Sequence, residues 1–340
     1  MIQYRDIKSV FILMEPRLWF GHLLQSTISE KTSNDIKEVD ILCDIDIRDL
    51  SYNMPRQKDM AVCFVYFNAS NSKRILMNFL YVQNMMQLAQ IPIFTIEVYS
   101  DKPAIYKSFR IKSDSVLFHK ERLCYLLEKQ IPAKYTKLLF LDADIVFDNP
   151  AWYDELSTAL DSYDIVHPYE KANWLDLTYT KIVRQAESVM SDKKNRSAIN
   201  NKSHLGFGWA FKRPIFNKYG FYQYCIIGSG DSLSTMAWFK QIPARLTNDV
   251  NSEYETLPYK DFLKTVTPTP KMSYISGTVY HLYHGSFKNR NYYNRHCIFK
   301  GIVDIRSILK EDESGLFQIT DPEIAQKVKD YFKDRDDDGV

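Results

Sequence analysis

The chain lacks a strong excess of charge of either sign. Its 340 residues contain 44 lysines and arginines and 42 aspartates and glutamates, which gives a net charge of +2. The pI is about 8.1. A protein that binds nucleic acid through a basic surface, or that acts through an acidic tail, usually shows a larger imbalance. We therefore expect no nucleic-acid partner.

Cysteine pairs and long apolar runs are also missing. The five cysteines are scattered and form no C-x-x-C pair, which favours a reducing compartment over a disulfide scaffold. The most apolar early stretch, residues 10–24, is interrupted by Glu15, Pro16 and Arg17, so it is too short and too charged to cross a bilayer. It also lacks the basic start and the cleavage site of a signal peptide. The sequence predicts a soluble, cytoplasmic protein with no membrane span.

The chain does contain an alternation of apolar strands and amphipathic helices. Residues 60–67 form a continuous β-branched and aromatic run, typical of a strand buried on both faces. A polar turn at 68–73, helical spacing of apolar residues over 74–90 and a second strand at 91–100 complete a βαβ unit of a parallel sheet. The alternation predicts an α/β fold with a mostly parallel sheet flanked by helices.

The later part of the chain continues this pattern. We expect helices at 119–130, 149–163, 232–240 and 321–335, and strands at 137–147, 164–169 and from 277 into a polar loop that ends at 290. In the last helix, Asp321 is the expected N-cap and Pro322 the first helical residue.

Three parts of the chain can be distinguished. In residues 1–57 charges alternate with short apolar runs, which we interpret as an N-terminal extension or small lobe. Residues 58–310 carry the α/β pattern and form the expected main domain, and residues 311–340 form a C-terminal helical segment. With 45% hydrophobic residues, the chain can bury a large core.

Two carboxylates follow the apolar run at 138–141 in mid-chain. Asp142 and Asp144 stand at the carboxyl end of an expected strand, where open α/β sheets bind their ligands. Residues two apart in a strand project to the same side, so both carboxylates can share one divalent cation. Oxygen ligands suit Mg²⁺ or Mn²⁺, and such an ion would neutralise a diphosphate. The alternative is that the D-x-D tripeptide only closes a strand and caps a helix.

Five segments, in order along the chain, resemble GT-A-type glycosyltransferases, which use nucleotide sugars. They are "VYFNASNSKR" (65–74), "LLFLDADIVFDNP" (138–150), "GFGWAFKR" (206–213), "YGFYQYCIIGSGD" (219–231) and "YHLYHGSFKNR" (280–290). The first resembles the strand and loop that hold the nucleoside, and the second the D-x-D segment. The third and fourth resemble the segments around the sugar and the acceptor hydroxyl, and the last the one that completes the metal site and grips the diphosphate. The resemblance implies a GT-A, Rossmann-like fold with residues 58–310 as a single catalytic domain.

The resemblance also implies roles for individual residues. Metal ligands, for Mn²⁺ or Mg²⁺, are expected among Asp142, Asp144, His281 and His284. The nucleotide-sugar donor would contact Tyr66, Phe67, Asn68, Lys73, Arg74, Asp142, Ala143, Gly285, Lys288 and Arg290. The sugar and the acceptor would contact Trp174, Gly208, Trp209 and Gly230.

The two histidines leave an alternative open. Glycogenin-like transferases carry a His three residues before the Gly, whereas His281 lies four before Gly285 and His284 one before it. In an ideal strand, residues three apart point to different faces. Both imidazoles can therefore reach one ion only if the chain bends, as a glycine allows.

Asp231 is the expected catalytic residue. It follows "GSG" and opens a helix, so it can act as a capping acid of the first turn. It can also act as the general base that takes the proton from an acceptor hydroxyl. The two roles are compatible.

Together these features predict a metal-dependent glycosyltransferase. It would move a hexosyl or pentosyl group from a nucleoside-diphosphate sugar, with UDP favoured, to a hydroxyl acceptor such as a glycan, with inversion favoured. One alternative is a nucleotidyltransferase acting on sugar phosphates, which would favour a glycine-rich loop after the first strand. The loop at 68–74 has Lys73 and Arg74 but no glycine. The other alternative is a non-catalytic carbohydrate-binding protein.

Overall fold

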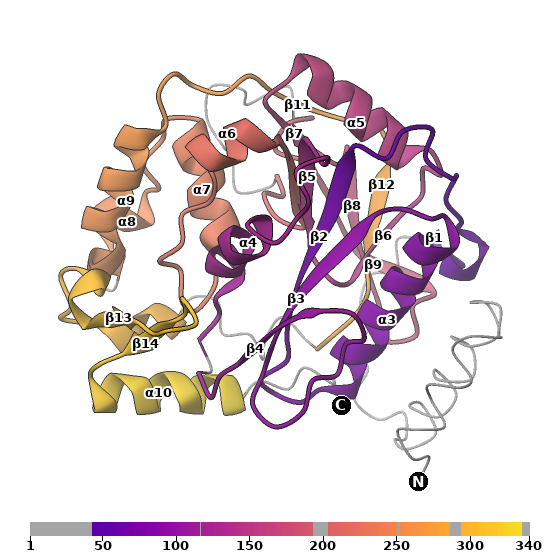
Figure 1. Cartoon of the computed structure of the whole chain (residues 1–340). Helices are drawn as coiled ribbons and strands as arrows, with labels where there is room; N and C mark the ends of the chain where they lie inside the picture. Colours follow the sequence, from indigo (N-terminus) through magenta and orange to yellow (C-terminus); the bar gives the residue numbers. More distant parts are fainter. Residues whose placement is uncertain (1–42, 116, 193–202, 250–251, 286–293, 335–340) are drawn as a thin grey trace, which may run out of the picture.

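The computed structural model describes residues 43–115, 117–192, 203–249, 252–285 and 294–334. In this part of the chain a seven-stranded sheet forms the centre (Figure 1). Its order is β11 (Met272–Tyr274), β7 (Ile165–His167), β10 (Gly208–Lys212), β5 (Lys137–Leu141), β2 (Met60–Phe67), β3 (Ile93–Tyr99) and β4 (Phe109–Lys112). β10 runs antiparallel to both of its neighbours, and the other strand pairs are parallel. The expected α/β fold with a mostly parallel sheet is confirmed.

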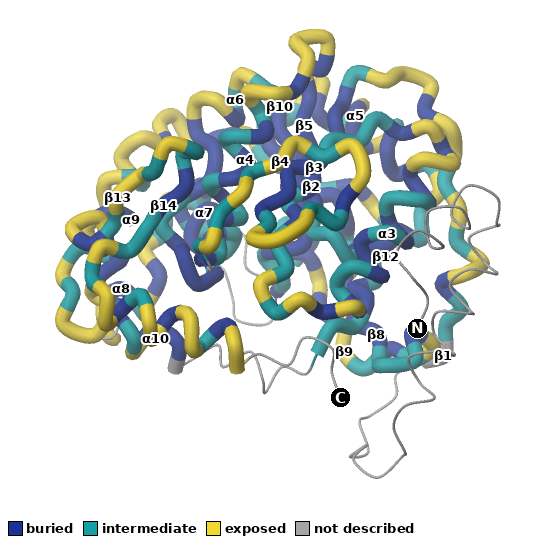
Figure 2. The backbone as a smooth tube through the Cα atoms, turned by 60° about the horizontal axis from the view of Figure 1, so that its bottom comes forward, coloured by how far each residue is buried: buried dark blue, intermediate teal, exposed yellow. Residues whose placement is uncertain are grey.

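The two faces of the central sheet are covered by different elements, because strand residues alternate between the faces. Met60, Val62 and Phe64 of β2 belong to a core shared with α3 (Lys73–Leu88) and α5 (Trp152–Ser162). Ala61 and Cys63 face the other core. That core is shared with α4 (Lys120–Glu128), α6 (Arg213–Lys218), α7 (Gly230–Trp238) and α9 (Glu253–Thr265). Figure 2 shows the buried backbone in the interior strands and the exposed segments in the outer loops.

A second sheet lies on the same side as α3 and α5. It has the order β1 (Cys43–Asp44), β9 (Lys181–Glu187), β8 (Lys171–Leu175), β12 (Thr278–His281) and β6 (Ile145–Phe147). Its residues join the core of that face.

The single strand expected over 137–147 is wrong. The chain leaves the central sheet after β5 and enters the second sheet at β6. The intervening turn is held from two sides: the Asp142 N–H donates to the Phe207 carbonyl (2.8 Å), and the Asp144 carbonyl accepts from the Leu282 N–H (2.9 Å). The D-x-D segment is therefore the crossing point between two sheets rather than the end of one strand.

The ends of the described chain pack against this body. β1 pairs with β9, and the Phe147 N–H donates to the Tyr52 hydroxyl (3.1 Å). After η4 (Asn294–Phe299) and η5 (Ile305–Ile308), β13 (Leu309–Glu311) pairs with β14 (Phe317–Ile319). The C-terminal helix α10 (Pro322–Lys333) follows, and its N-cap Asp321 accepts from two backbone N–H groups, as expected. The division at residues 57 and 310 stays a prediction.

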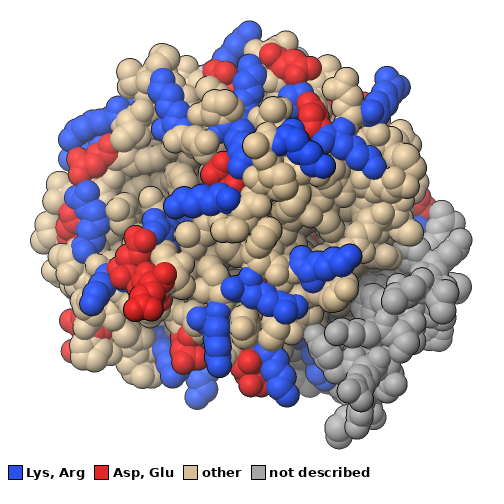
Figure 3. Space-filling view, in the orientation of Figure 1, with Lys and Arg blue, Asp and Glu red and all other residues tan. Residues whose placement is uncertain are grey.

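Two surface features complete the description. On the face seen in Figure 3, basic and acidic side chains are interspersed. In the described ranges of the chain, no helix has the length and apolar character that crossing a bilayer requires. The remaining short helices are η1 (Ile47–Asp49) and α8 (Arg245–Asn248).

Candidate active site

A cavity of about 880 Å³ lies at the carboxyl ends of β2 and β5. The lining includes residues 67–70 at the end of β2, residues 142–144 after β5, the first residues of α4 and α7, and the two histidines His281 and His284. This is the edge at which open α/β sheets bind ligands. The structure therefore has a cavity at the place where the sequence predicted a ligand site.

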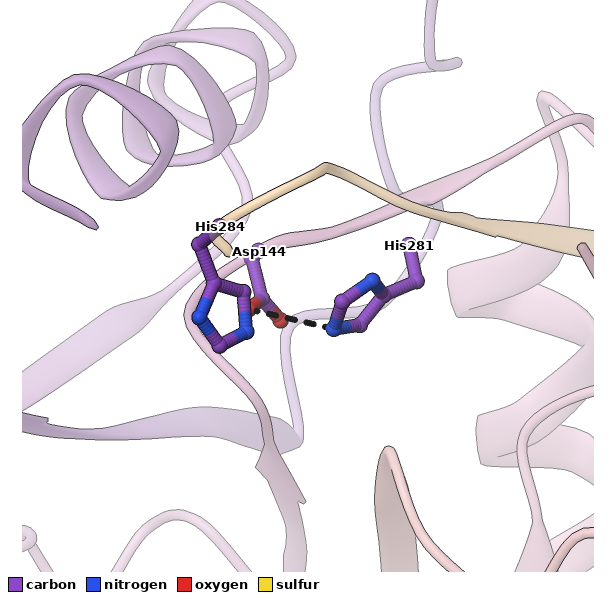
Figure 4. A group of neighbouring side chains, drawn as sticks. All are labelled: Asp144, His281 and His284. Carbon is purple, nitrogen blue, oxygen red and sulfur yellow. Dashed lines mark ion pairs between the residues drawn. The ribbon is translucent and has the colours of Figure 1, made fainter. Parts of the chain in front are cut away.

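Asp144, His281 and His284 meet at the cavity wall (Figure 4). The Nε2 atoms of His284 and His281 lie 2.9 Å and 3.5 Å from Asp144 Oδ2. One ligand atom from each of the three residues lies within 4.8 Å of the others. The chain leaves the strand between the two histidines, because β12 ends at His281. Strand alternation therefore does not separate the two imidazoles.

The donor set of this cluster fits a divalent cation. One carboxylate and two imidazoles, gathered within coordination reach, are ligands of first-row transition ions. Mg²⁺ is held almost entirely by oxygen atoms, so the two imidazoles favour an ion such as Mn²⁺.

Asp142 faces a different partner. Its carboxylate forms an ion pair with the Lys120 ammonium of α4. Burial raises the pKa of Asp142 to about 6, although Lys120 opposes the shift. Burial alone would lower the pKa of Lys120, but the carboxylates of Asp142, Asp231 and Glu121 more than compensate, so its pKa is raised. The cavity lining thus includes an ammonium, paired with Asp142, that the sequence did not single out.

Asp231 lines the same cavity from the first turn of α7. Its Oδ1 accepts from the Ser232 N–H (2.8 Å), while the N-cap position belongs to Ser229. A Cβ at Gly206 would clash with Asp231 Oδ2, so this glycine makes room for the carboxylate. The contact with Ser232 fits a first-turn acid, and the position in the cavity fits a base.

Gly230 has a packing role next to Asp231. A Cβ there would clash with the carboxyl group of Glu121, so the glycine lets α7 approach α4. Glu121 is buried, and burial raises its pKa to about 8. Gly230 itself is absent from the cavity lining.

The residues predicted to bind the donor divide into two groups. Phe67, Asn68 and Ala143 line the cavity. Asn68 also fixes the loop after β2, because its side chain accepts from the Ser72 N–H and donates to the Ser72 carbonyl (2.9 Å each). Tyr66 is buried behind it and accepts from Asn68 Nδ2.

The basic pair after this loop lies outside the cavity lining. Lys73 is exposed. Arg74 is buried, donates to the Tyr179 hydroxyl (3.0 Å) and stacks on the rings of Tyr179 and Tyr283. Lys288 and Arg290 lie outside the described residues.

Of the residues predicted to bind the sugar and acceptor, Trp174 lines the cavity. Trp209 is buried, stacks on His167 at a ring distance of 4.1 Å and donates to the Leu205 carbonyl. Gly208 allows close packing against Leu141. Neither Gly208 nor Trp209 lines this cavity.

Several lining residues were missed by sequence reasoning. They are Phe118, Lys120, Glu121, Arg184, His204, Arg295, Tyr331 and Phe332. They come from separate parts of the chain, and no local motif marks them. Only Lys120 and Glu121 had a feature in the sequence that could have indicated a place in the site, namely their position at the start of an expected helix.

No protein-family model matches this chain, and no curated protein sequence matches it. Solved structures do resemble its fold. The catalytic domain of Drosophila β1,4-galactosyltransferase 7, in complex with xylobiose, has 10% identity and a TM-score of 0.33, covering 64% of this chain and 66% of that one. GalNAc-T7 with UDP, GalNAc and Mn²⁺ has 13% identity and a TM-score of 0.38, covering 70% of this chain and 48% of that one.

A third structure has a different activity in its name. The 4-diphosphocytidyl-2C-methyl-D-erythritol synthase of Anaerococcus prevotii has 9% identity and a TM-score of 0.30, covering 81% of this chain and 98% of that one. This chain thus spans just under two thirds of the Drosophila structure and about half of GalNAc-T7. At these identities and TM-scores the likeness carries no argument about function, and the fold class rests on the strand order of the central sheet.

Proposed function

We propose that this protein is a metal-dependent glycosyltransferase that uses a nucleoside-diphosphate sugar. The observation that carries the proposal is the Asp144–His281–His284 cluster beside the Asp142–Lys120 ion pair, where the chain crosses between two sheets. A cation site and the partly exposed Lys120 ammonium on one cavity suit an anionic diphosphate. The cavity volume, about 880 Å³, is within the range of pockets for drug-sized ligands, roughly 300–1,000 Å³.

The residues would divide the work as follows. Asp144, His281 and His284 would hold Mn²⁺, which when bound offsets negative charge on the leaving diphosphate. Lys120 holds a fixed positive charge beside it. Phe67, together with its neighbours Asn68 and Ala143, would contact the nucleotide.

Asp231 would take the proton from the acceptor hydroxyl. Its carboxylate lines the cavity next to Gly206, and a single base of this kind suits an inverting transfer. We expect a UDP-sugar that carries a hexose or pentose as the donor, and a glycan hydroxyl as the acceptor.

Calorimetry followed by a hydrolysis screen tests this function. UDP should bind in the presence of Mn²⁺ and bind much more weakly without it. Incubation with Mn²⁺ and UDP-, GDP- or TDP-sugars should then release sugar from one donor. A clear preference for a nucleoside triphosphate would replace the proposal with a nucleotidyltransferase. Indifference to both metal and nucleotide would leave a carbohydrate-binding protein.

A further inference from the structure

His204 has a fixed hydrogen-bonding state. Its Nδ1 lies 2.7 Å from the Tyr169 hydroxyl oxygen, and this hydroxyl donates its proton to the Gly206 carbonyl at 2.8 Å. A phenol has one proton to donate, and a carbonyl can only accept. The proton between His204 and Tyr169 must therefore belong to Nδ1, which donates to the tyrosine oxygen.

The other ring nitrogen of His204 is an acceptor. Burial and the nearby cations Arg184 and Lys120 lower the pKa of His204 to about 3, so the ring is neutral at physiological pH. A neutral imidazole with its proton on Nδ1 carries a lone pair on Nε2.

His204 lines the cavity, and among the described residues none hydrogen-bonds its Nε2. Nε2 is also accessible to solvent, since it is absent from the buried side-chain atoms that have no hydrogen-bond partner. The His204 backbone is fixed on both sides, because its N–H donates to the Glu187 carbonyl and its carbonyl accepts from the Val189 N–H.

The surroundings of His204 suit a sugar ring. Trp174 packs edge-to-face against it with the ring centres 4.9 Å apart, and Trp174 also lines the cavity. A Cβ at Gly206 would lie 3.3 Å from His204 Cε1 and would clash with Asp231 Oδ2, so His204 and Asp231 are close neighbours. A neutral acceptor beside a carboxylate is suited to a ligand that carries hydroxyl groups.

We propose that His204 binds substrate, with Nε2 accepting a hydrogen bond from a sugar hydroxyl, and that Tyr169 is a positioning residue that fixes the required tautomer. This inference rests on the proposed function. The hydroxyl belongs either to the donor sugar or to the acceptor, and enzyme kinetics distinguish the two.

Two substitutions of His204 distinguish the roles of its two ring nitrogens. His204→Asn keeps a donor near the position of Nδ1 but removes the acceptor at Nε2, whereas His204→Gln can restore an acceptor there. His296 offers a matched control: its Nδ1 lies 2.7 Å from the Tyr254 hydroxyl, and neither residue lines the cavity. His296→Asn should leave all kinetic constants unchanged.

Kinetics are measured with the UDP-sugar that the hydrolysis screen selects and with a panel of p-nitrophenyl glycosides as acceptors. If the donor sugar is bound, His204→Asn should raise the KM for the UDP-sugar about 3- to 10-fold in hydrolysis, the usual effect of one lost hydrogen bond. If the acceptor is bound, only the glycoside KM should rise by this amount. In both cases UDP affinity should stay unchanged and His204→Gln should recover part of the loss. Unchanged KM values for both substrates in His204→Asn would overturn the proposal.

NMR of the ring nitrogens tests the same proposal without turnover. His204 should show a protonated Nδ1 and a bare Nε2 at neutral pH, and Tyr169→Phe should shift the proton toward Nε2. Tyr254→Phe should leave the His204 signals unchanged. With diamagnetic Zn²⁺ in place of paramagnetic Mn²⁺, the UDP-sugar or a glycoside should shift the Nε2 signal, whereas UDP alone should not. A protonated Nε2 in the wild-type protein, or no shift with either sugar, would contradict the assignment even if the chain hydrolysed UDP-sugars normally.

Discussion

Asp142 and Asp144 are separated by one residue but make different contacts. Asp144 faces two imidazoles, whereas Asp142 forms an ion pair with Lys120. Ala143 lies between them in a turn that joins two sheets. Because this segment is not a continuous strand, the rule that alternate residues project to the same side does not apply to it. The two carboxylates can therefore have separate functions.

This difference leads to a test at Asp144. Asp144→Asn replaces a charged ligand by a neutral amide, so Mn²⁺ affinity should fall by at least roughly 10-fold. Asp142→Asn leaves the Asp144–His281–His284 set in place and should weaken Mn²⁺ binding less, although it removes the partner of Lys120. Calorimetric titration with Mn²⁺ measures both. Equal losses in the two variants would mean that both carboxylates bind the ion, as the sequence predicted.

Asp231 can be tested by a substitution that keeps its local hydrogen bond. Asparagine retains an oxygen that can accept from the Ser232 N–H but cannot accept a proton at neutral pH. If Asp231 is the base, Asp231→Asn should lower kcat by roughly 10²-fold, with little change in UDP affinity. Rates of transfer to a glycoside acceptor and UDP calorimetry give the two quantities. A kcat close to that of the wild type, with an inverted product by NMR, would leave Asp231 with only a structural role.

At the scale of elements, α4 and α7 approach each other through Gly230 and Glu121. In a helix, alanine is normally more stable than glycine by roughly 1 kcal/mol. At Gly230, however, a Cβ would clash with the Glu121 carboxyl. Gly230→Ala should therefore destabilise the protein by roughly 1–3 kcal/mol.

A double-mutant cycle identifies the cause of that loss. In the Glu121→Ala background the clash is absent, so adding Gly230→Ala should be neutral or stabilising. Chemical denaturation of the four proteins gives the coupling free energy. If the two effects were simply additive, the contact between Gly230 and Glu121 would not be the reason for the glycine.

The same buried acid gives the stability a pH dependence. The pKa of Glu121 is about 8 in the folded protein, against 4.5 for a free glutamate side chain, because burial disfavours the charged carboxylate and Lys120 offsets this only in part. A group with a raised acid pKa contributes full stability below pH 4.5 and loses it as pH rises toward 8. Glu121→Gln cannot ionise, so relative to the wild type it should gain stability as pH rises through this window, on the order of 4 kcal/mol in total. Urea denaturation at pH 4.5 and 8.5 measures this gain, and a constant difference between the two proteins would contradict the raised pKa.

Elements that depend on local periodicity were predictable from the sequence. The strand at 60–67 appears as β2 with the expected bounds, and Asp321 caps α10 as expected. The break between β5 and β6 was not predictable, because residues 138–147 are apolar on both sides of the turn. Only pairing with partners distant in sequence, Phe207 and Leu282, shows where the chain changes sheet.

At the scale of the whole molecule, the position of the cavity could be predicted from the sequence, but most of the residues that line it could not. The alternation of strands and helices predicted a ligand site at the carboxyl end of the strand before Asp142. His204, Arg184 and Phe332 come from parts of the chain far apart in sequence, and all three line the cavity. Their approach results from tertiary packing, and no spacing along the chain encodes it. Arg74 is an example of a residue that the sequence placed in the site but that lies elsewhere. We predicted that it contacts the donor, whereas its guanidinium packs against the rings of Tyr179 and Tyr283.

A ligand that binds across this cavity should stabilise the entire fold, because its contacts come from both sheets and from α4 and α7. At 100 times its Kd, a ligand specific for the folded state adds about 2.7 kcal/mol to the free energy of unfolding. For a chain of this length, Mn²⁺ and UDP together should raise Tm by roughly 5 °C. The shift should disappear in EDTA and in His284→Ala, which lacks one of the imidazoles beside Asp144, but persist in His296→Asn, because His296 does not line the cavity. Differential scanning calorimetry measures these shifts. An equal rise in Tm for the His284→Ala variant would place the nucleotide away from the cluster and remove the main support for the proposed function.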